Sequence, residues 1–204
     1  MLRRSSQLRF ATKVGAVTSS FDFTHQVVNQ ATPLVNYDAL LSNPRYAETL
    51  NHGVANGLVR QGDKDLCVEF GKVSGRQEMI EASHLANKHQ PIFAAFDRYG
   101  RRGPGRAEFH PSYHTMMKHA IEHRVPSLPW VQKDAFVPRC VLSGLHYQLE
   151  QGTSCPVTMT FAGVAPLKRA LSKVASVESD EAKELKFWID KLTSGKYDSR
   201  DVHV

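Results

Sequence analysis

The sequence predicts an all-α fold, a bundle of about five or six helices behind an N-terminal leader. Apolar side chains recur at three- and four-residue spacing in several windows, which is the period of an amphipathic helix. Asn, His-Pro or Ser stands at the start of several of these windows, as capping and first-turn residues do. No window shows the alternation of a half-buried strand, and 204 residues suit one domain.

The helices follow one another with short connections after an extended arm over residues 21–33. They are expected over residues 43–62, 77–89, 110–123, 138–152, 156–166 and 179–195. The last has the clearest signals, because Ser179 is followed by two acids and Gly195 closes the pattern. The helix over residues 110–123 has a continuous apolar stripe that includes Met116, Met117 and Ile121. This stripe predicts a face that packs on a core.

Residues 152–166 form the least polar long stretch of the chain, without a charged side chain. Apolar groups on every side predict a buried central helix, which Pro156 begins and Pro166 kinks or ends. Thr158 and Thr160 are the polar exceptions. Each hydroxyl either bonds back to a carbonyl one turn earlier or faces a ligand.

Residues 101–106 read Arg-Arg-Gly-Pro-Gly-Arg and are expected to be an irregular loop. Two interpretations remain open for this loop. It is either a solvated connection or an anion site, in which guanidinium and backbone N–H groups hold a phosphate. It lacks the context of a P-loop or a dinucleotide fingerprint.

Two histidine pairs lie four residues apart on the helix over residues 110–123. They are His110 with His114 and His119 with His123. This spacing suits two metal ligands on one helical face, but no carboxylate stands in a matching position. Surface or capping histidines are the preferred interpretation, with a metal site as the alternative.

The N-terminal 21 residues carry four basic residues and no acid. With its scattered apolar residues this segment predicts a mitochondrial transit peptide and a location in the matrix. The formal charge of +6 therefore falls to +2 for residues 22–204, which gives little support to nucleic-acid binding. No apolar run is long enough to span a bilayer.

The three cysteines, Cys67, Cys140 and Cys155, are odd in number and widely spaced. They predict free thiols in a reducing compartment rather than a disulfide framework. Cys155 stands at the start of the helix over residues 156–166, and is expected to be a packed or spectator thiol.

Six segments, taken together and in order, resemble the N-terminal part of the acyl-CoA dehydrogenase superfamily, and within it the AidB-like, adaptive-response branch. The resemblance covers approximately residues 30–200. It is carried by residues 33–38, 85–91, 97–102, 108–114, 128–130 and 152–166.

The resemblance implies a helical domain over residues 22–204 that packs on a central β-domain and a C-terminal bundle, together holding FAD. Such enzymes remove an α-proton from an acyl-CoA with a carboxylate and pass a hydride to the flavin. The resemblance further implies a homo-oligomer, a tetramer in the family, and an association with DNA through the C-terminal part. Thr158, Met159, Thr160 and Phe161 are implied to line the acyl and flavin cavity.

The family's catalytic glutamate and main flavin contacts match no residue up to Val204. No catalytic residue is therefore assigned, and the polypeptide alone is expected to be inactive. Two explanations of the ending remain open. The sequence is either a fragment of a longer dehydrogenase or a non-catalytic helical module that binds DNA or a protein.

Overall fold

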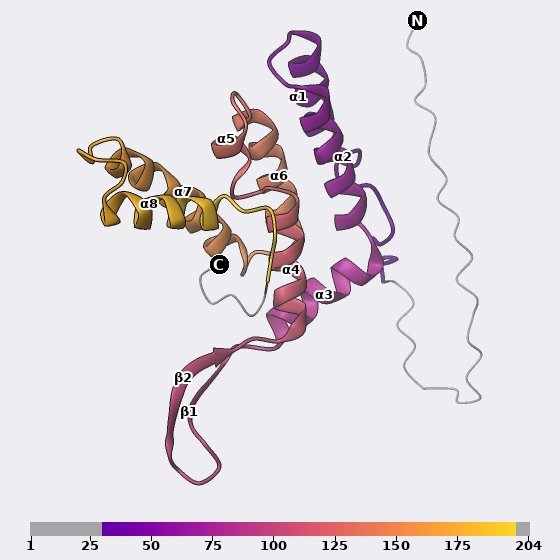
Figure 1. Ribbon diagram of the computed structural model, residues 1–204. Helices are drawn as coiled ribbons and strands as arrows, with labels where there is room; N and C mark the ends of the chain where they lie inside the picture. The colour runs from indigo at the N-terminus through magenta and orange to yellow at the C-terminus, as the bar shows by residue number, and fades with distance from the viewer. Residues whose placement is uncertain (1–29, 199–204) are drawn as a thin grey trace, which may run out of the picture. The chain divides into compact units, whose positions relative to one another are not determined.

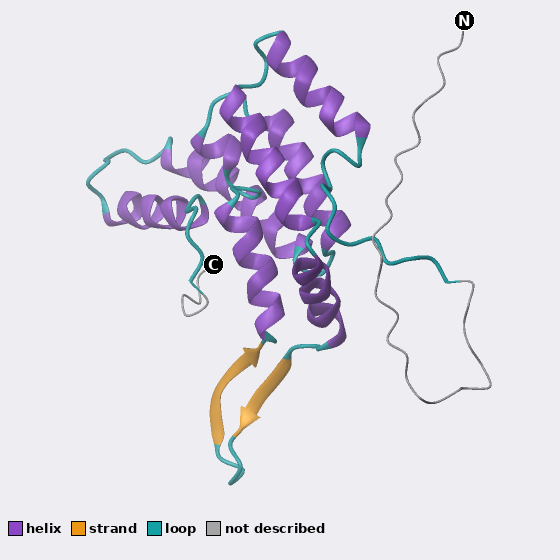
Figure 2. Cartoon of the chain, turned by 90° about the vertical axis from the view of Figure 1, so that its right-hand side faces the viewer, coloured by secondary structure: helices purple, strands orange, loops and turns teal. Residues whose placement is uncertain are grey.

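The computed structural model describes residues 30–198 and divides the chain into units over Met1–Pro33 and Leu34–Val204. The described part is mostly helical, which confirms the predicted class. It holds eight helices and a two-stranded antiparallel sheet (Figures 1 and 2). The helices are α1 (Pro44–Ala55), α2 (Gln61–Ser74), α3 (Gln77–Lys88), α4 (Pro111–Glu122), α5 (Leu128–Val131), α6 (Phe136–Leu149), α7 (Ser154–Leu171) and α8 (Asp180–Leu192).

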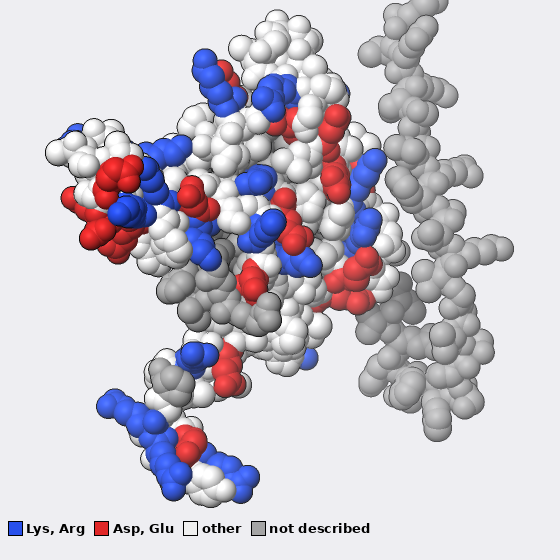
Figure 3. Space-filling view, viewed as in Figure 1, with Lys and Arg blue, Asp and Glu red and all other residues white. Residues whose placement is uncertain are grey.

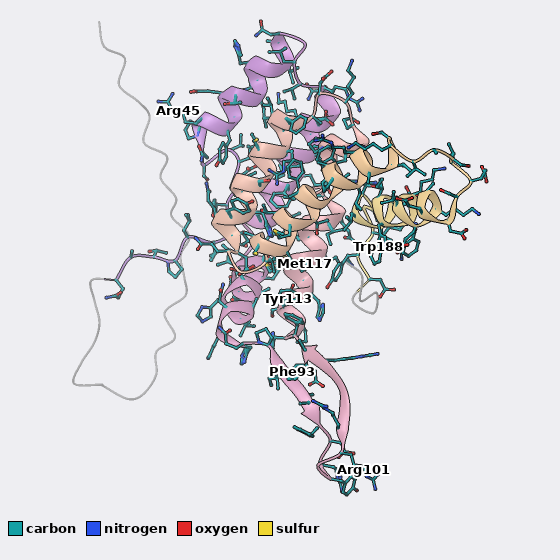
Figure 4. All side chains as sticks on the ribbon, turned by 90° about the vertical axis from the view of Figure 1, so that its left-hand side faces the viewer. Arg45, Phe93, Arg101, Tyr113, Met117 and Trp188 are labelled. Atoms are coloured by element: carbon teal, nitrogen blue, oxygen red, sulfur yellow. The ribbon has the colours of Figure 1, made fainter. Side chains whose placement is uncertain are left out.

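The centre of the helical unit is α6, which packs against α1, α2, α3, α5 and α7. It buries Val141, Leu142 and Leu145 on successive turns, and even His146 is fully enclosed. The core around it is apolar and draws on most of the helices. It includes Leu50, Phe70, Met117, Ala120, Ile121, Val125 and Val157 (Met117 is labelled in Figure 4).

The predicted burial of residues 152–166 is wrong. α7 packs mainly on α8, with fewer contacts to α4 and α6, and Val157 and Val164 are its buried residues. Met159 is 66% exposed. The helix also begins at Ser154, two residues before Pro156, and continues through Pro166 to Leu171. Pro156 therefore does not start the helix, and Pro166 does not end it.

The sequence predicted several helix boundaries correctly and missed one helix. Ser179 caps α8, because its hydroxyl accepts a hydrogen bond from the Ala182 N–H. α4 also begins as predicted, with His110 at its N-cap. The predicted first helix, over residues 43–62, ends at Ala55 as α1, and α2 over Gln61–Ser74 was not predicted.

The chain between α3 and α4 forms a β-hairpin, which corrects the predicted loop over residues 101–106. β1 (Ile92–Phe96) pairs with β2 (Arg102–Glu108). Asp97 closes the turn, because its Oδ1 accepts hydrogen bonds from the Tyr99 and Arg101 N–H groups at 2.8 and 2.9 Å. Gly100 follows with φ +78°, a conformation that favours glycine.

The junction of α6 and α7 is held by a buried carboxylate. Glu150 is 3% exposed and accepts hydrogen bonds from the Gly152 N–H at 2.6 Å and from both the N–H and hydroxyl of Thr153. The Asn87 amide of α3 adds a fourth donor at 3.2 Å. The carboxylate also lies at the N-terminal end of α7, where the helix dipole favours a negative charge.

Glu150→Gln is expected to lower the free energy of unfolding by about 2 kcal/mol, because the new NH2 group faces N–H donors and leaves buried hydrogen bonds unmade. Urea denaturation followed by circular dichroism measures this change. Glu48→Gln on α1 is the matched control, since the Glu48 side chain is 68% exposed. Equal denaturation midpoints for the two variants would contradict a stabilising role for Glu150.

Candidate functional site

The four residues predicted to line a cavity lie on about one turn of α7, and the structure separates them into two groups. The Thr158 hydroxyl shares a 2.6 Å hydrogen bond with Tyr147 of α6, on the exposed side of the domain. Met159 lies fully toward solvent. The Thr160 hydroxyl instead donates to the Pro156 carbonyl at 2.9 Å, one of the two roles expected for it.

Phe161 packs toward the domain rather than outward. Its carbonyl accepts a 2.9 Å hydrogen bond from the Trp130 indole of α5, and the two rings lie 5.2 Å apart. Phe136 meets Phe161 edge-on at 6.4 Å, and the Arg139 guanidinium stands 4.0 Å from the Phe161 ring centre. Phe161 is therefore an anchor of α7 on α5 and α6.

The outward side of α7 is consequently defined by Thr158, Met159 and the Tyr147 hydroxyl. Sequence reasoning missed Tyr147, because its meeting with Thr158 depends on how α6 packs on α7. It also missed Phe136 and Arg139, which stand one turn apart on α6. The structure shows the Phe136 ring to be 53% exposed, and large exposed apolar groups point to a contact surface.

Two hollows of the described surface lie away from these four residues. One, of about 150 Å³, is lined by Leu34, Tyr37, Ala39, Ser74, Ile80, Leu145, Gln148 and Leu149. The other, of about 290 Å³, is lined by Pro111, His114, Thr115, Lys118, Tyr197 and Asp198. The candidate residues thus form an open face, not the wall of either hollow.

The cysteines differ in burial from what the sequence predicted. Cys155 is exposed at the start of α7, which excludes the packed alternative and leaves that of a spectator thiol. Cys67 is the buried one, and burial, with Asp63 nearby, raises the pKa of its thiol to about 12. All three are free thiols, as expected.

The histidines of α4 take separate partners. His114 Nδ1 bonds to the Tyr197 hydroxyl at 2.6 Å, and His110 stacks on His89 with ring centres 4.5 Å apart. His119 is buried, stacks on Phe70 at 4.1 Å and shares a 2.9 Å hydrogen bond with Ser74. Among the described residues, no group of three His, Cys, Asp or Glu is placed to hold a metal ion.

Two of the core histidines are held neutral by their surroundings. Burial lowers the pKa of His119 to about 3, and His123 and His146 act in the same direction. Burial likewise lowers the pKa of His146 to about 4, although Glu150 acts in the opposite direction. The Thr153 hydroxyl donates to Glu150 and lies 3.1 Å from His146 Nε2, which therefore donates to it.

Comparisons with known proteins identify the fold and the family of this chain. A solved structure of Caenorhabditis elegans ACDH-11 in complex with C11-CoA superposes with a TM-score of 0.63 at 17% identity, over 85% of this chain and 29% of that one. AidB of Escherichia coli (strain K12), which its name places among the acyl-CoA dehydrogenases, is 33% identical over 179 residues. The structural match and this relative define an acyl-CoA dehydrogenase-like N-terminal helical domain.

The family described as "Adaptive response protein AidB N-terminal domain" matches residues 29–199. The chain belongs to this family, which confirms the resemblance found in the sequence. The AidB match covers 86% of this chain but 30% of that protein. The chain therefore spans under a third of the length of both relatives.

The predicted mitochondrial location is corrected by the AidB comparison. That relative comes from a bacterium, which has no mitochondria, and the family match begins at residue 29. The basic segment over residues 1–21 lies outside the described residues. Of the described helices, none combines the length and the apolar character that a bilayer crossing requires.

We expect the free energy of unfolding to fall as the pH drops below about 6.5, the pKa of histidine in an unfolded chain. The folded-state pKa values of His119 and His146 lie near 3 and 4, so the unfolded chain binds more protons in between. Each histidine contributes a slope of up to about 1.4 kcal/mol per pH unit. Urea denaturation at pH 7, 6 and 5 measures it.

The variant His146→Gln keeps an N–H donor toward Thr153 and removes one titrating group, so its slope is expected to be smaller by up to one proton. His84→Gln, on the exposed side of α3, serves as the control and keeps the full slope. A slope that is unchanged by His146→Gln would show that the loss of stability in acid has another origin.

Proposed function

We propose that residues 30–198 form the N-terminal helical part of an AidB-like, FAD-dependent acyl-CoA dehydrogenase, and that the outward side of α7 forms one wall of the acyl and flavin cavity. The observation that carries the proposal is the exposure of α7. A helix without a charged side chain from Ser154 to Leu167 leaves Met159 66% exposed. Burial against a further part of a longer protein would remove this apolar surface from water.

The exposed groups fit one wall of such a cavity and not the whole site. The Met159 thioether suits contact with an acyl chain or a ring, and the Thr158 and Tyr147 hydroxyls offer hydrogen bonds beside it. A pyrophosphate needs backbone N–H groups or cations, so this wall suits the ring or acyl part of its ligands. When bound, FAD supplies the redox chemistry, in which a hydride is accepted.

Glu150 does not serve as the base of such a reaction. It is the buried carboxylate next to α7 in sequence, but its two oxygens already accept four hydrogen bonds. A base must offer a lone pair to the proton that it removes. The proton-abstracting carboxylate is therefore assigned to a part of the longer protein. A homo-oligomer and a DNA partner likewise remain predictions from the family resemblance.

The purified 204-residue chain is expected to bind no stoichiometric flavin and to show no turnover of acyl-CoA, because one wall provides a small fraction of the contacts that hold a cofactor. Visible absorption after incubation with FAD and gel filtration tests this expectation. Retained flavin that bleaches when acyl-CoA is added would contradict it. Oxidation of acyl-CoA by an electron acceptor is the independent second readout.

The cavity wall is tested in a chimera, in which residues 30–198 replace the matching N-terminal part of E. coli AidB. Met159→Glu is expected to reduce flavin retention or turnover at least tenfold, since an unpaired carboxylate in an apolar cavity is costly. Val177→Glu is the matched control, because Val177 is 61% exposed in the connection between α7 and α8. Equal effects of the two variants would exclude α7 from the cavity.

A further inference from the structure

The β1–β2 hairpin extends beyond the ends of α3 and α4 (Figure 1), and basic side chains gather on it (Figure 3). Its strands pair with each other in a sheet of two. Three rings are largely in solvent, since Phe93, Phe96 and Tyr99 are 67%, 63% and 69% exposed. The arginines are exposed too, and they are Arg98, Arg101, Arg102 and Arg106.

The strand register places an arginine directly opposite an aromatic ring. Phe96 pairs with Arg102, and Ala94 pairs with Arg106 beyond an irregularity in the register, and residues that are directly opposite share one face of the hairpin. At the turn, the Arg98 and Arg101 guanidinium groups lie 4.8 and 5.7 Å from the centre of the Tyr99 ring. Arg101 marks this free end in Figure 4.

The hairpin holds the entire basic excess of the chain beyond its leader. Its four arginines and two acids give residues 92–108 a charge of +2, which equals that of residues 22–204 as a whole. The salt bridges of the described residues include none of these arginines. Asp97 directs its Oδ1 at turn N–H groups. The guanidinium donors are available to an external anion.

A lone two-stranded hairpin is marginally stable in water. Its exposed aromatic rings add a further free-energy cost, which a ligand that covers them would remove.

A membrane is a poor candidate for this ligand, because the charged turn would enter the bilayer before Phe93 and Ile92, which lie nearer the helices. Arginine in place of lysine suits phosphate, which its planar guanidinium contacts with two parallel hydrogen bonds. Rings interleaved with arginines suit unpaired bases, since every base offers a face for stacking.

We propose that the β1–β2 hairpin binds single-stranded nucleic acid, RNA or DNA, with its arginines on the phosphates and its aromatic rings stacked on bases. Arg102, opposite Phe96, and Arg106, opposite Ala94, contact phosphates, while Tyr99 stacks at the turn. Duplex bases are already stacked on one another, so the rings contribute to binding only when the strand is unpaired.

Fluorescence anisotropy of the 204-residue chain with labelled uridine and deoxythymidine oligonucleotides tests the proposal, with a duplex of equal length for comparison. Both single strands are expected to bind more tightly than the duplex. A preference for uridine over deoxythymidine would identify RNA as the ligand, and equal binding would assign recognition to phosphate and base. Equal or tighter binding of the duplex would overturn the proposal.

Variants then separate the two kinds of contact. Arg102→Ala with Arg106→Ala is expected to reduce the slope of log affinity against log salt by about 1.4, because each lost phosphate contact on a single strand removes about 0.7. Tyr99→Ala and Phe96→Ala are expected to weaken binding about fivefold or more without changing that slope. Tyr99→Phe, which keeps the aromatic ring, is expected to bind the oligonucleotide as tightly as the unaltered chain.

Arg45→Ala is the matched control, since the Arg45 side chain on α1 is 90% exposed. Far-UV circular dichroism and thermal unfolding of each variant verify that the helices remain folded. Undiminished oligonucleotide binding by the folded hairpin variants would overturn the proposal. Light scattering gives a second test. Hairpin variants that lose an oligomer while their nucleic-acid binding stays unchanged would also overturn the proposal, because the hairpin would then form a contact between copies of the chain.

Discussion

The position of α7 depends on the buried carboxylate of Glu150. A carboxylate taken out of water must be matched by donors, and here the Gly152 and Thr153 groups and the Asn87 amide supply them. The same network reaches His146 in the last turn of α6 through the Thr153 hydroxyl. One side chain therefore connects α3, α6 and the start of α7, and no cation is required.

This connection fixes which side of α7 remains in solvent. Once Thr153 is held by Glu150, the helical repeat turns Val157 and Val164 toward the domain and Met159 away from it. Phe161 then meets Trp130 and Arg139, which secures the helix one turn further along. The exposed side of α7 is thus set by local hydrogen bonding and packing.

Sequence reasoning succeeded where local signals decide the structure. Ser179 and the stripe of α8, and the apolar period of α4, specify helices without reference to the rest of the chain. It failed for α2, because Gly62 and Gly71 interrupt the apolar pattern. The packing explains the second glycine, since a Cβ at Gly71 would come within 2.8 Å of the Leu40 backbone nitrogen. The hairpin had a signal in Asp97 and Gly100, which suit a tight turn, but its strands lack apolar alternation.

The candidate site and the charge distribution show a different limit. Apolar content predicted a buried helix over residues 152–166, yet Met159 is 66% exposed, because apolar content carries no information about where the neighbouring elements of the domain lie. The net charge, in turn, does not show where charges are concentrated. A sum of +2 over residues 22–204 suggests a neutral surface, yet residues 92–108 account for all of it and the remainder is balanced. Where charges gather depends on the fold, so the electrostatic argument against a polyanionic ligand holds for the helices and fails for the hairpin.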